Sequence, residues 1–189
     1  MRIYELNEDY FEEIDSEEKA YMLGFIFADG NIQKDKNRLR ITLKEGDKEI
    51  LFRFKELLEY TGDIKIRELK SNQRNTKGYM IAELSVFSKK LISDLNNLGV
   101  YPNKTFTIKY PNIPKELDKH FIRGFFDGDG SIYERKDRPN GFWIELSCAS
   151  KEFLEVIAEK LEYNAIEKVD VVPKRNIYYF TKYKLKAKS

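Results

Sequence analysis

The sequence predicts an α+β fold in which two units, related by a pseudo-twofold axis, each run helix, two strands, helix, two strands, helix (αββαββα). The first observation behind this prediction is a repeat: residues 21–32 read YMLGFIFADGNI, and residues 121–132 read FIRGFFDGDGSI. The second is that the same succession of strand and helix patterns follows each copy. Duplication at so long a period indicates internal twofold symmetry rather than a solenoid. Residues 184–189 are too few for a helix, so we expect the second unit to lack its last one.

Each copy of the repeat is expected to be a helix that ends on an aspartate, Asp29 in the first and Asp129 in the second. The glycine after each aspartate predicts a left-handed residue at the helix end. We expect the helices to cross along faces of small residues, because side chains four apart stack on one side of a helix. Two carboxylates brought together beside two partially negative helix ends favour a bound divalent cation. The small-residue faces comprise Ala20, Gly24 and Ala28 in the first helix and His120, Gly124 and Gly128 in the second.

Composition and charge exclude several other classes of protein. The chain of 189 residues has one cysteine, Cys148, which excludes an internal disulfide and a cysteine-based zinc site. No apolar run approaches the length of a membrane span, and the N-terminus lacks a signal-peptide pattern, so we expect a soluble intracellular protein. The net charge of +2 is low for a nucleic-acid-binding protein, but acidic residues crowd the first twenty positions and leave the remainder basic.

The chain is expected to divide into four parts. An acidic arm (1–15) precedes the first unit (16–100), a proline-rich linker (101–118) follows it, and the second unit occupies residues 119–189. Asp15 and Glu18 form the expected capping box of the first helix. Alternating and helical periodicities then place the other elements. Strands are expected from residue 32 and at 39–44, 64–67, 79–86, 131–135, 142–147, 169–172 and 177–183, and helices at 47–60, 88–98 and 151–163.

Each unit is expected to present an antiparallel sheet with one face covered by helices and the other open. Basic and amide side chains alternate along these strands, which is typical either of an ordinary solvated face or of a surface that reads base edges in a DNA major groove. Two such sheets side by side form a concave saddle for double-stranded DNA. Trp143 either contacts the DNA or pairs with an aromatic neighbour. The predicted DNA-binding residues are Arg40, Thr42, Lys44, Lys65, Arg67, Gln73 and Arg74 in the first unit and Arg135, Arg138, Trp143, Lys174 and Arg175 in the second.

The two repeats resemble the LAGLIDADG motif of homing endonucleases, in the form that carries two motifs on one chain. Residues 124–132, GFFDGDGSI, are the closer match, whereas Phe27 stands where the first copy is expected to have the earlier acid of the motif. The later acid, which binds metal in the family, is kept in both copies as Asp29 and Asp129. The resemblance covers nearly the whole chain, and it implies a monomer that grips a long DNA site in its saddle.

The resemblance also implies the chemistry. Enzymes of this family hydrolyse one phosphodiester bond in each DNA strand with a divalent metal, Mg²⁺ or Mn²⁺, which lowers the pKa of a water nucleophile. The implied metal ligands are Asp29, Asp129 and the backbone carbonyls of Ala28 and Gly128. Lys104 occupies the place of a family lysine that orients or deprotonates water or stabilises the phosphate. The resemblance therefore implies three catalytic residues, the two aspartates and this lysine.

Two functions are open at this point: a site-specific endonuclease, and a DNA-binding regulator or RNA-splicing maturase that keeps the scaffold without cutting. Retention of both acids and of Lys104 favours the endonuclease, because a protein that does not cut has no chemical need for them. An intein is disfavoured, since neither an N-terminal Cys or Ser nor a terminal His-Asn pair flanks the chain. His120, the lone histidine, is assigned to packing because it lies on the small-residue face.

Overall fold

The computed structural model of the protein describes residues 3–70, 78–102, 107–134, 142–163, 171–174 and 177–183. Two units of matching element order confirm the predicted α+β fold. The first unit consists of α1 (Glu17–Asp29), β1 (Gly30–Gln33), β2 (Arg38–Lys44), α2 (Lys48–Leu57), β3 (Lys65–Leu69), β4 (Tyr79–Phe87) and α3 (Lys89–Asn97). The second consists of α4 (Asp118–Asp129), β5 (Gly130–Glu134), β6 (Phe142–Cys148), α5 (Lys151–Tyr163), β7 (Val172–Lys174) and β8 (Ile177–Tyr183).

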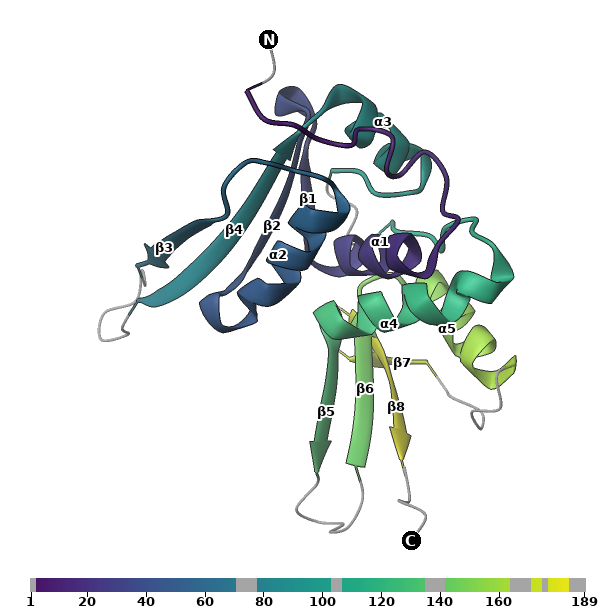
Figure 1. The fold of residues 1–189 in the computed structure, drawn as a ribbon. Helices are drawn as coiled ribbons and strands as arrows, with labels where there is room; N and C mark the ends of the chain where they lie inside the picture. The colour runs from purple at the N-terminus through teal and green to yellow at the C-terminus, as the bar shows by residue number, and fades with distance from the viewer. Residues whose placement is uncertain are drawn as a thin grey trace, which may run out of the picture.

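Each unit contains one four-stranded antiparallel sheet. The strand order is β1-β2-β4-β3 in the first sheet and β5-β6-β8-β7 in the second, so the two units share one topology. Figure 1 shows the two sheets extending in different directions from a common centre, where α1 and α4 lie side by side. Helices α2 and α3 pack against the first sheet and α5 against the second, which leaves one face of each sheet open.

The common centre is a direct contact between the backbones of α1 and α4. A Cβ atom placed on Gly24 would lie 2.0 Å from the carbonyl oxygen of Phe121. A Cβ atom on Gly124 would likewise lie 2.0 Å from the carbonyl oxygen of Tyr21, which is the symmetric contact. Because neither position has room for a side chain, the two helices touch through their glycines. The predicted crossing along small residues is therefore confirmed.

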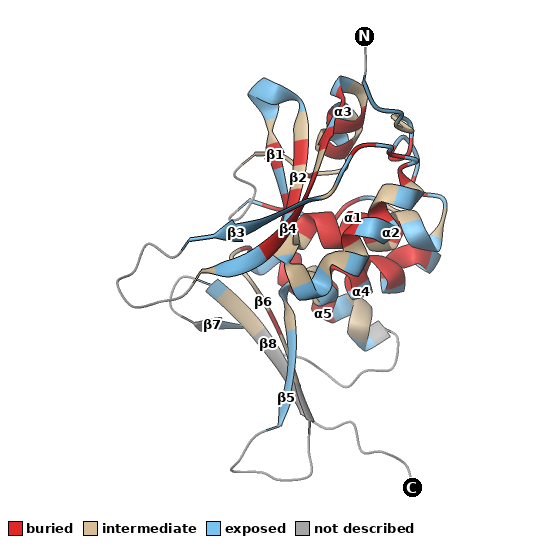
Figure 2. Ribbon diagram, turned by 60° about the vertical axis from the view of Figure 1, so that its left-hand side comes forward, coloured by how far each residue is buried: buried red, intermediate tan, exposed pale blue. Residues whose placement is uncertain are grey.

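Aromatic side chains hold each motif helix against the second helix of its own unit. Phe25 of α1 meets Phe54 of α2 edge to face, with ring centroids 5.3 Å apart. Phe125 of α4 meets Phe153 of α5 in the same way at 4.8 Å. All four rings are at most 1% exposed, so each contributes both hydrophobic burial and a favourable ring geometry. Figure 2 shows that the buried residues gather on α1, α4 and the elements packed against them.

The prediction of a left-handed glycine after each motif helix is wrong. Gly30 (φ −74°) and Gly130 (φ −87°) are both extended, although their N–H groups still bond to the carbonyl groups of Ile26 and Phe126. Glycine is needed at these positions for a steric reason. A Cβ on Gly30 would lie 2.5 Å from the Ile26 carbonyl oxygen, and one on Gly130 would lie 2.3 Å from the Phe126 ring. The chain can therefore pass from helix to strand without a connecting loop.

The N-terminus of α1 also differs from its prediction by one residue. Ser16 is the capping residue, because its Oγ accepts a hydrogen bond from the backbone N–H of Lys19 at 3.3 Å. Asp15 instead pairs with the Lys19 ammonium group at 2.9 Å. The predicted cap of α3 is confirmed, since Ser88 Oγ accepts from the backbone N–H of Leu91 at 3.1 Å.

The residues before α1 form an arm that contains no regular helix in its described part. Its Phe11 side chain is fully buried in the core. The Asn7 N–H donates to the Leu58 carbonyl oxygen at 2.9 Å, and the Ser88 hydroxyl donates to the Glu8 carboxylate. The arm therefore joins the C-terminal end of α2 to the N-terminal end of α3.

The first strands of the two units differ in burial at equivalent positions. Ile32 of β1 is 4% exposed, because it belongs to a core to which α3 contributes Leu91 and Leu95. Ile132, at the equivalent place in β5, is 59% exposed.

None of the described helices is both long enough and apolar enough to span a membrane.

Replacing Gly124 with alanine should destabilise the protein, although alanine is the better helix former by about 1 kcal/mol. The added methyl group would meet a backbone oxygen that cannot move unless α1 and α4 separate, and overpacking of this kind costs roughly 1–3 kcal/mol. Urea unfolding followed by circular dichroism measures the change. Gly46→Ala is the matched control, because a Cβ there has nothing within 4 Å. Equal stability of the two variants would contradict the close helix contact.

Candidate functional site

The two motif acids end their helices at the same end of the α1–α4 contact. Ala28 packs directly on Gly128, where a Cβ would lie 2.4 Å from the Ala28 methyl carbon. That Cβ would also lie 3.1 Å from Oδ2 of Asp29, so the Asp29 carboxylate reaches across onto α4. Asp129 is the next residue on α4, and it is exposed, whereas Asp29 is half-buried. The fold thus brings both acids to the junction of the two units.

The chemistry of these donors fits a hard divalent cation. Each carboxylate lies at a helix C-terminus, where the helix dipole adds partial negative charge. The described residues contain no cluster of three or more His, Cys, Asp and Glu side chains suited to a metal. Two carboxylates match the number through which proteins usually bind Mg²⁺, with water and substrate phosphates completing the coordination. Ligation by the Ala28 and Gly128 carbonyls stays a prediction.

One flank of the helix pair is polar, and the symmetric flank is aromatic. The Tyr21 hydroxyl donates a hydrogen bond to Oδ2 of Asp127 across the interface, at 2.8 Å. Burial, together with this bond and the charge of Asp127, raises the pKa of Tyr21 to about 12, so the hydroxyl is a proton donor at neutral pH. At the symmetric positions, the rings of Phe27 and Phe121 meet edge to face with centroids 5.1 Å apart. Phe27 therefore replaces the motif acid at a place where the facing residue, Phe121, has no hydroxyl to donate.

The open face of the first sheet brings together five predicted DNA-binding residues: Arg40, Thr42, Lys44, Lys65 and Arg67. They share a face because cross-strand neighbours in an antiparallel sheet point to the same side. Sequence reasoning missed further polar residues of this face, although alternation along β1 and β4 was the signal that could have found them. The register places on it Asn31 and Gln33 of β1, Arg38 of β2, and Glu83 and Ser85 of β4.

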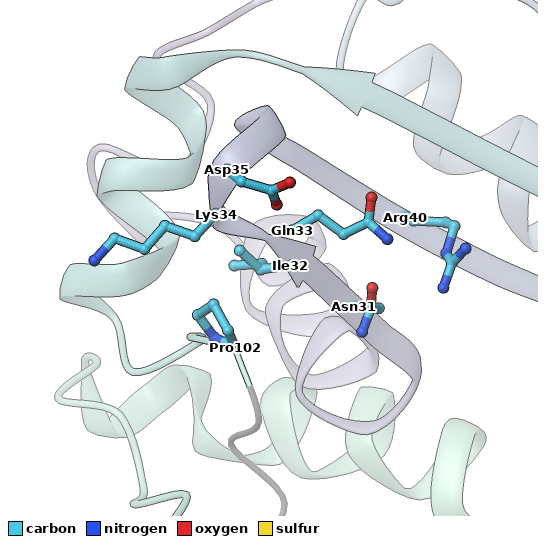
Figure 3. Close-up of a pocket in the computed structure, with 7 residues that line it drawn as sticks. All are labelled: Asn31, Ile32, Gln33, Lys34, Asp35, Arg40 and Pro102. Atoms are coloured by element: carbon cyan, nitrogen blue, oxygen red, sulfur yellow. The ribbon is translucent and has the colours of Figure 1, made fainter.

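An open pocket of about 820 Å³ lies beside β1 at the edge of this face (Figure 3). The side chains of Asn31 and Gln33 extend from β1 toward the side on which Arg40 stands. Amide and guanidinium groups can donate to base edges and to phosphate oxygens, so the pocket is chemically suited to nucleic acid. The lining residues are Asn31, Ile32, Gln33, Lys34, Asp35, Arg40 and Pro102.

The open face of the second sheet differs from the first among its described residues. Ser131 pairs with Glu145 at the position where Asn31 pairs with Arg40 in the first sheet. The acidic residue Glu145 therefore occupies the position of the basic residue Arg40. The Tyr133 hydroxyl donates to Oε2 of Glu145 at 3.3 Å. The two halves of the saddle therefore present different charges at an equivalent position.

Several predicted site residues lie outside the described residues, and their roles stay predictions. Trp143 and Lys174 belong to β6 and β7, and the register assigns both positions to the open face, but their side chains are not described. The predicted residues outside the described ranges are Gln73, Arg74, Lys104, Arg135, Arg138 and Arg175.

Paired helices that touch through glycine, end on acids and carry two open antiparallel sheets define a LAGLIDADG-type scaffold. The family model of the LAGLIDADG-like domain matches residues 16–99 and 116–182. The chain therefore belongs to the LAGLIDADG-like domain family.

Two relatives come from Methanocaldococcus jannaschii. The chain is 33% identical over 180 residues to the replication factor C small subunit, a match that covers 89% of this chain and 9% of that protein. It is 32% identical over 145 residues to the probable translation initiation factor IF-2, covering 71% of this chain and 10% of that protein. The chain thus spans about a tenth of the length of either relative.

Solved structures share the fold at low sequence identity. The homing endonuclease I-WcaI bound to its DNA recognition sequence superposes with a TM-score of 0.65 at 14% identity, covering 92% of this chain and 80% of that one. The N-terminal LAGLIDADG domain of WhiA superposes with a TM-score of 0.56 at 18% identity, covering 95% of this chain and 84% of that one. A single-residue variant of the homing endonuclease I-DmoI, in complex with its target DNA in the presence of Mg, superposes with a TM-score of 0.50 at 18% identity, covering 93% of this chain and 89% of that one.

Restoring an acid at position 27 should destabilise the protein rather than improve its site. Phe27 is 2% exposed, and its ring stacks on Phe153 and meets Phe121 edge to face. Phe27→Asp loses this packing. It also buries a carboxylate that has no hydroxyl donor, whereas Asp127 accepts a hydrogen bond from Tyr21. We expect a loss of about 3–5 kcal/mol in the free energy of unfolding. Urea titration measures it, with the exposed substitution Asp127→Asn as the control. Wild-type stability of Phe27→Asp would show that the aromatic flank is not a constraint.

Proposed function

We propose that the protein is a site-specific DNA endonuclease, a homing endonuclease that hydrolyses one phosphodiester bond in each strand of a long double-stranded site. It acts inside the cell as a monomer and requires a divalent metal, Mg²⁺ or Mn²⁺. The observation that carries this proposal is the reach of the Asp29 carboxylate across the helix contact to the residue beside Asp129. A scaffold that only binds DNA has no chemical need for two acids at the junction of its halves.

Each part of the proposed site has a separate task. Asp29 and Asp129, with the carbonyl groups of Ala28 and Gly128, would hold the metal. When bound, the metal neutralises charge on the scissile phosphate and lowers the pKa of a water molecule. Lys104 orients this water or accepts its proton. Water attacks the phosphorus, one P–O ester bond breaks, and the departing sugar oxygen takes up a proton from solvent, so no side chain has to act as a nucleophile.

The open sheet faces bind the DNA on either side of this centre. Arg40, Lys65 and Arg67 supply charge and hydrogen-bond donors in the first half-site, where an antiparallel ribbon fits the major groove. The second half-site is bound by the face that includes the Trp143 and Lys174 positions. The similarity of fold to I-WcaI bound to its recognition sequence, and to I-DmoI bound to its target, supports this arrangement.

A DNA-binding regulator or RNA-splicing maturase on the same scaffold is the second candidate. It is supported by the similarity of fold to the N-terminal LAGLIDADG domain of WhiA. Incubation of the protein with a plasmid library in Mg²⁺, followed by sequencing of the cut ends, separates the two candidates. Recurrent double-strand breaks at one sequence support the endonuclease, whereas selective binding without any cut supports the regulator.

Asp29→Asn and Asp129→Asn should each lower double-strand cleavage by roughly 10²-fold or more, because an amide is a poor substitute for a metal-binding carboxylate. Both variants should still bind the same DNA in Ca²⁺, since neither acid reads sequence. Asp127→Asn is the matched control, because the Asp127 carboxylate is engaged by Tyr21 on the flank of the interface. Cleavage assays and gel-shift titrations measure the two effects. Robust cutting by both single variants would overturn the assignment of the acids.

DNA binding should weaken steeply with salt, with the slope of log affinity against log salt changing by about 0.9 for each phosphate contact. Arg40→Ala should reduce the slope by this amount if Arg40 binds phosphate, or lower preference at particular base pairs if it binds a base. Arg53→Ala is the control, because Arg53 lies on α2 and pairs with Glu56 on the covered side of the sheet. An equal effect of the two substitutions would contradict binding through the open face.

A further inference from the structure

Glu83 is an acid among the basic residues on the open face of the first sheet. It lies on the inner strand β4, and the register places it between Thr42 of β2 and Lys65 of β3. Glu83 is only 8% exposed, although it belongs to the open face. An anion at this position repels the phosphates of a DNA ligand, so its presence on this surface requires an explanation.

Both carboxylate oxygens of Glu83 are engaged by neighbours on the same face. Oε1 accepts a hydrogen bond from the Ser85 hydroxyl at 3.0 Å, and Oε2 accepts one from Nη2 of Arg67 at 3.3 Å. Burial acts to raise the pKa of Glu83, but these two bonds and the charges of Arg67 and Arg40 outweigh it and hold the pKa below its usual value. Glu83 is therefore a fixed negative charge at neutral pH.

The contact with Glu83 restrains Arg67 without covering it. The Arg67 side chain stays 51% exposed, and a guanidinium group has five N–H donors, of which this contact uses one. An arginine that a carboxylate of its own sheet holds has already lost rotamer freedom before any ligand arrives. It therefore loses less conformational entropy when it binds DNA. Restraint of this kind matters little for a contact to phosphate, which tolerates many orientations. It matters for a bidentate contact to O6 and N7 of guanine, whose geometry is fixed.

We propose that Glu83 is a positioning residue that holds Arg67 in the orientation that reads a guanine, and that it thereby determines base preference in the first half-site. This inference rests on the proposed function, because it requires the open face to meet DNA. It assigns different roles to neighbouring basic residues: Arg67 reads a base, while basic residues of this face that no carboxylate holds supply the attraction to phosphate.

The test compares wild type, Glu83→Gln, Glu83→Asp, Arg67→Ala and the double variant Glu83→Gln/Arg67→Ala. The probe is a library of duplex oligonucleotides with a randomised 30-base-pair core, bound in Ca²⁺, with the selected sequences and their single-base variants then measured by fluorescence anisotropy. Glu68→Gln is the matched control, because it removes the same charge from β3 at a position that faces the other side of the sheet. Thermal unfolding of each variant reports whether it is folded.

Glu83→Gln should lose roughly 5- to 150-fold of the discrimination at one base pair, which is the range for one bidentate contact. The same variant should bind an unrelated duplex more tightly by a few fold, because a negative charge has been removed from the face. Glu83→Asp should lose the base preference without a gain in affinity for the unrelated duplex, because its charge is kept but its shorter side chain does not reach Arg67. Arg67→Ala should lose the same preference, and adding Glu83→Gln to it should change discrimination no further.

Three results would overturn the inference. Unchanged base preference in Glu83→Gln would mean that the ion pair is only structural. A switch to a different preferred base in Glu83→Gln, with Arg67→Ala unaffected, would mean that Glu83 itself contacts a base. If wild type selects no sequence at all, the proposed function fails and the inference fails with it, which distinguishes this case from the first two.

Discussion

The direct contact between the backbones of α1 and α4 sets the positions of all the other elements. Gly24 and Gly124 let the helices touch, and the next small pair, Ala28 and Gly128, keeps them together up to the motif acids. The strands β1 and β5 begin at the residues that follow these acids. One contact therefore fixes two things at once, the separation of the two carboxylates and the placement of the two sheets. Any loosening of it would be transmitted to both.

The twofold symmetry of the backbone is not repeated by the side chains. Tyr21 bonds to Asp127 on one flank of the helix pair, whereas two phenylalanine rings meet on the other. Arg40 on the first sheet corresponds to Glu145 on the second. The contacts that position the two motif acids are present in both units, whereas the surrounding surfaces differ. For the function proposed, two different halves are suited to an asymmetric DNA site rather than to a palindrome.

The repeat, the spacing of small residues and strand alternation were sufficient to predict the fold, the helix contact and the face of residues such as Arg40 and Lys65. What could not be predicted depends on distant parts of the chain. The Glu83 and Arg67 pair spans 16 residues across two strands, and the Tyr21 and Asp127 bond spans 106. The extended glycines after each helix were missed because their steric cause is the preceding helical turn, which composition does not reveal.

In the function proposed, one divalent metal site lies between the ends of α1 and α4 when DNA is bound. Fe²⁺ in place of Mg²⁺, with ascorbate and peroxide, generates hydroxyl radicals that cut the polypeptide next to the bound metal. Mass spectrometry of the fragments, from a complex with a selected duplex, then locates the metal along the chain. We expect cuts close to both Asp29 and Asp129, and we expect excess Mg²⁺ to abolish them by competition. Cuts near only one of these residues, or elsewhere in the chain, would contradict a site shared by the two units.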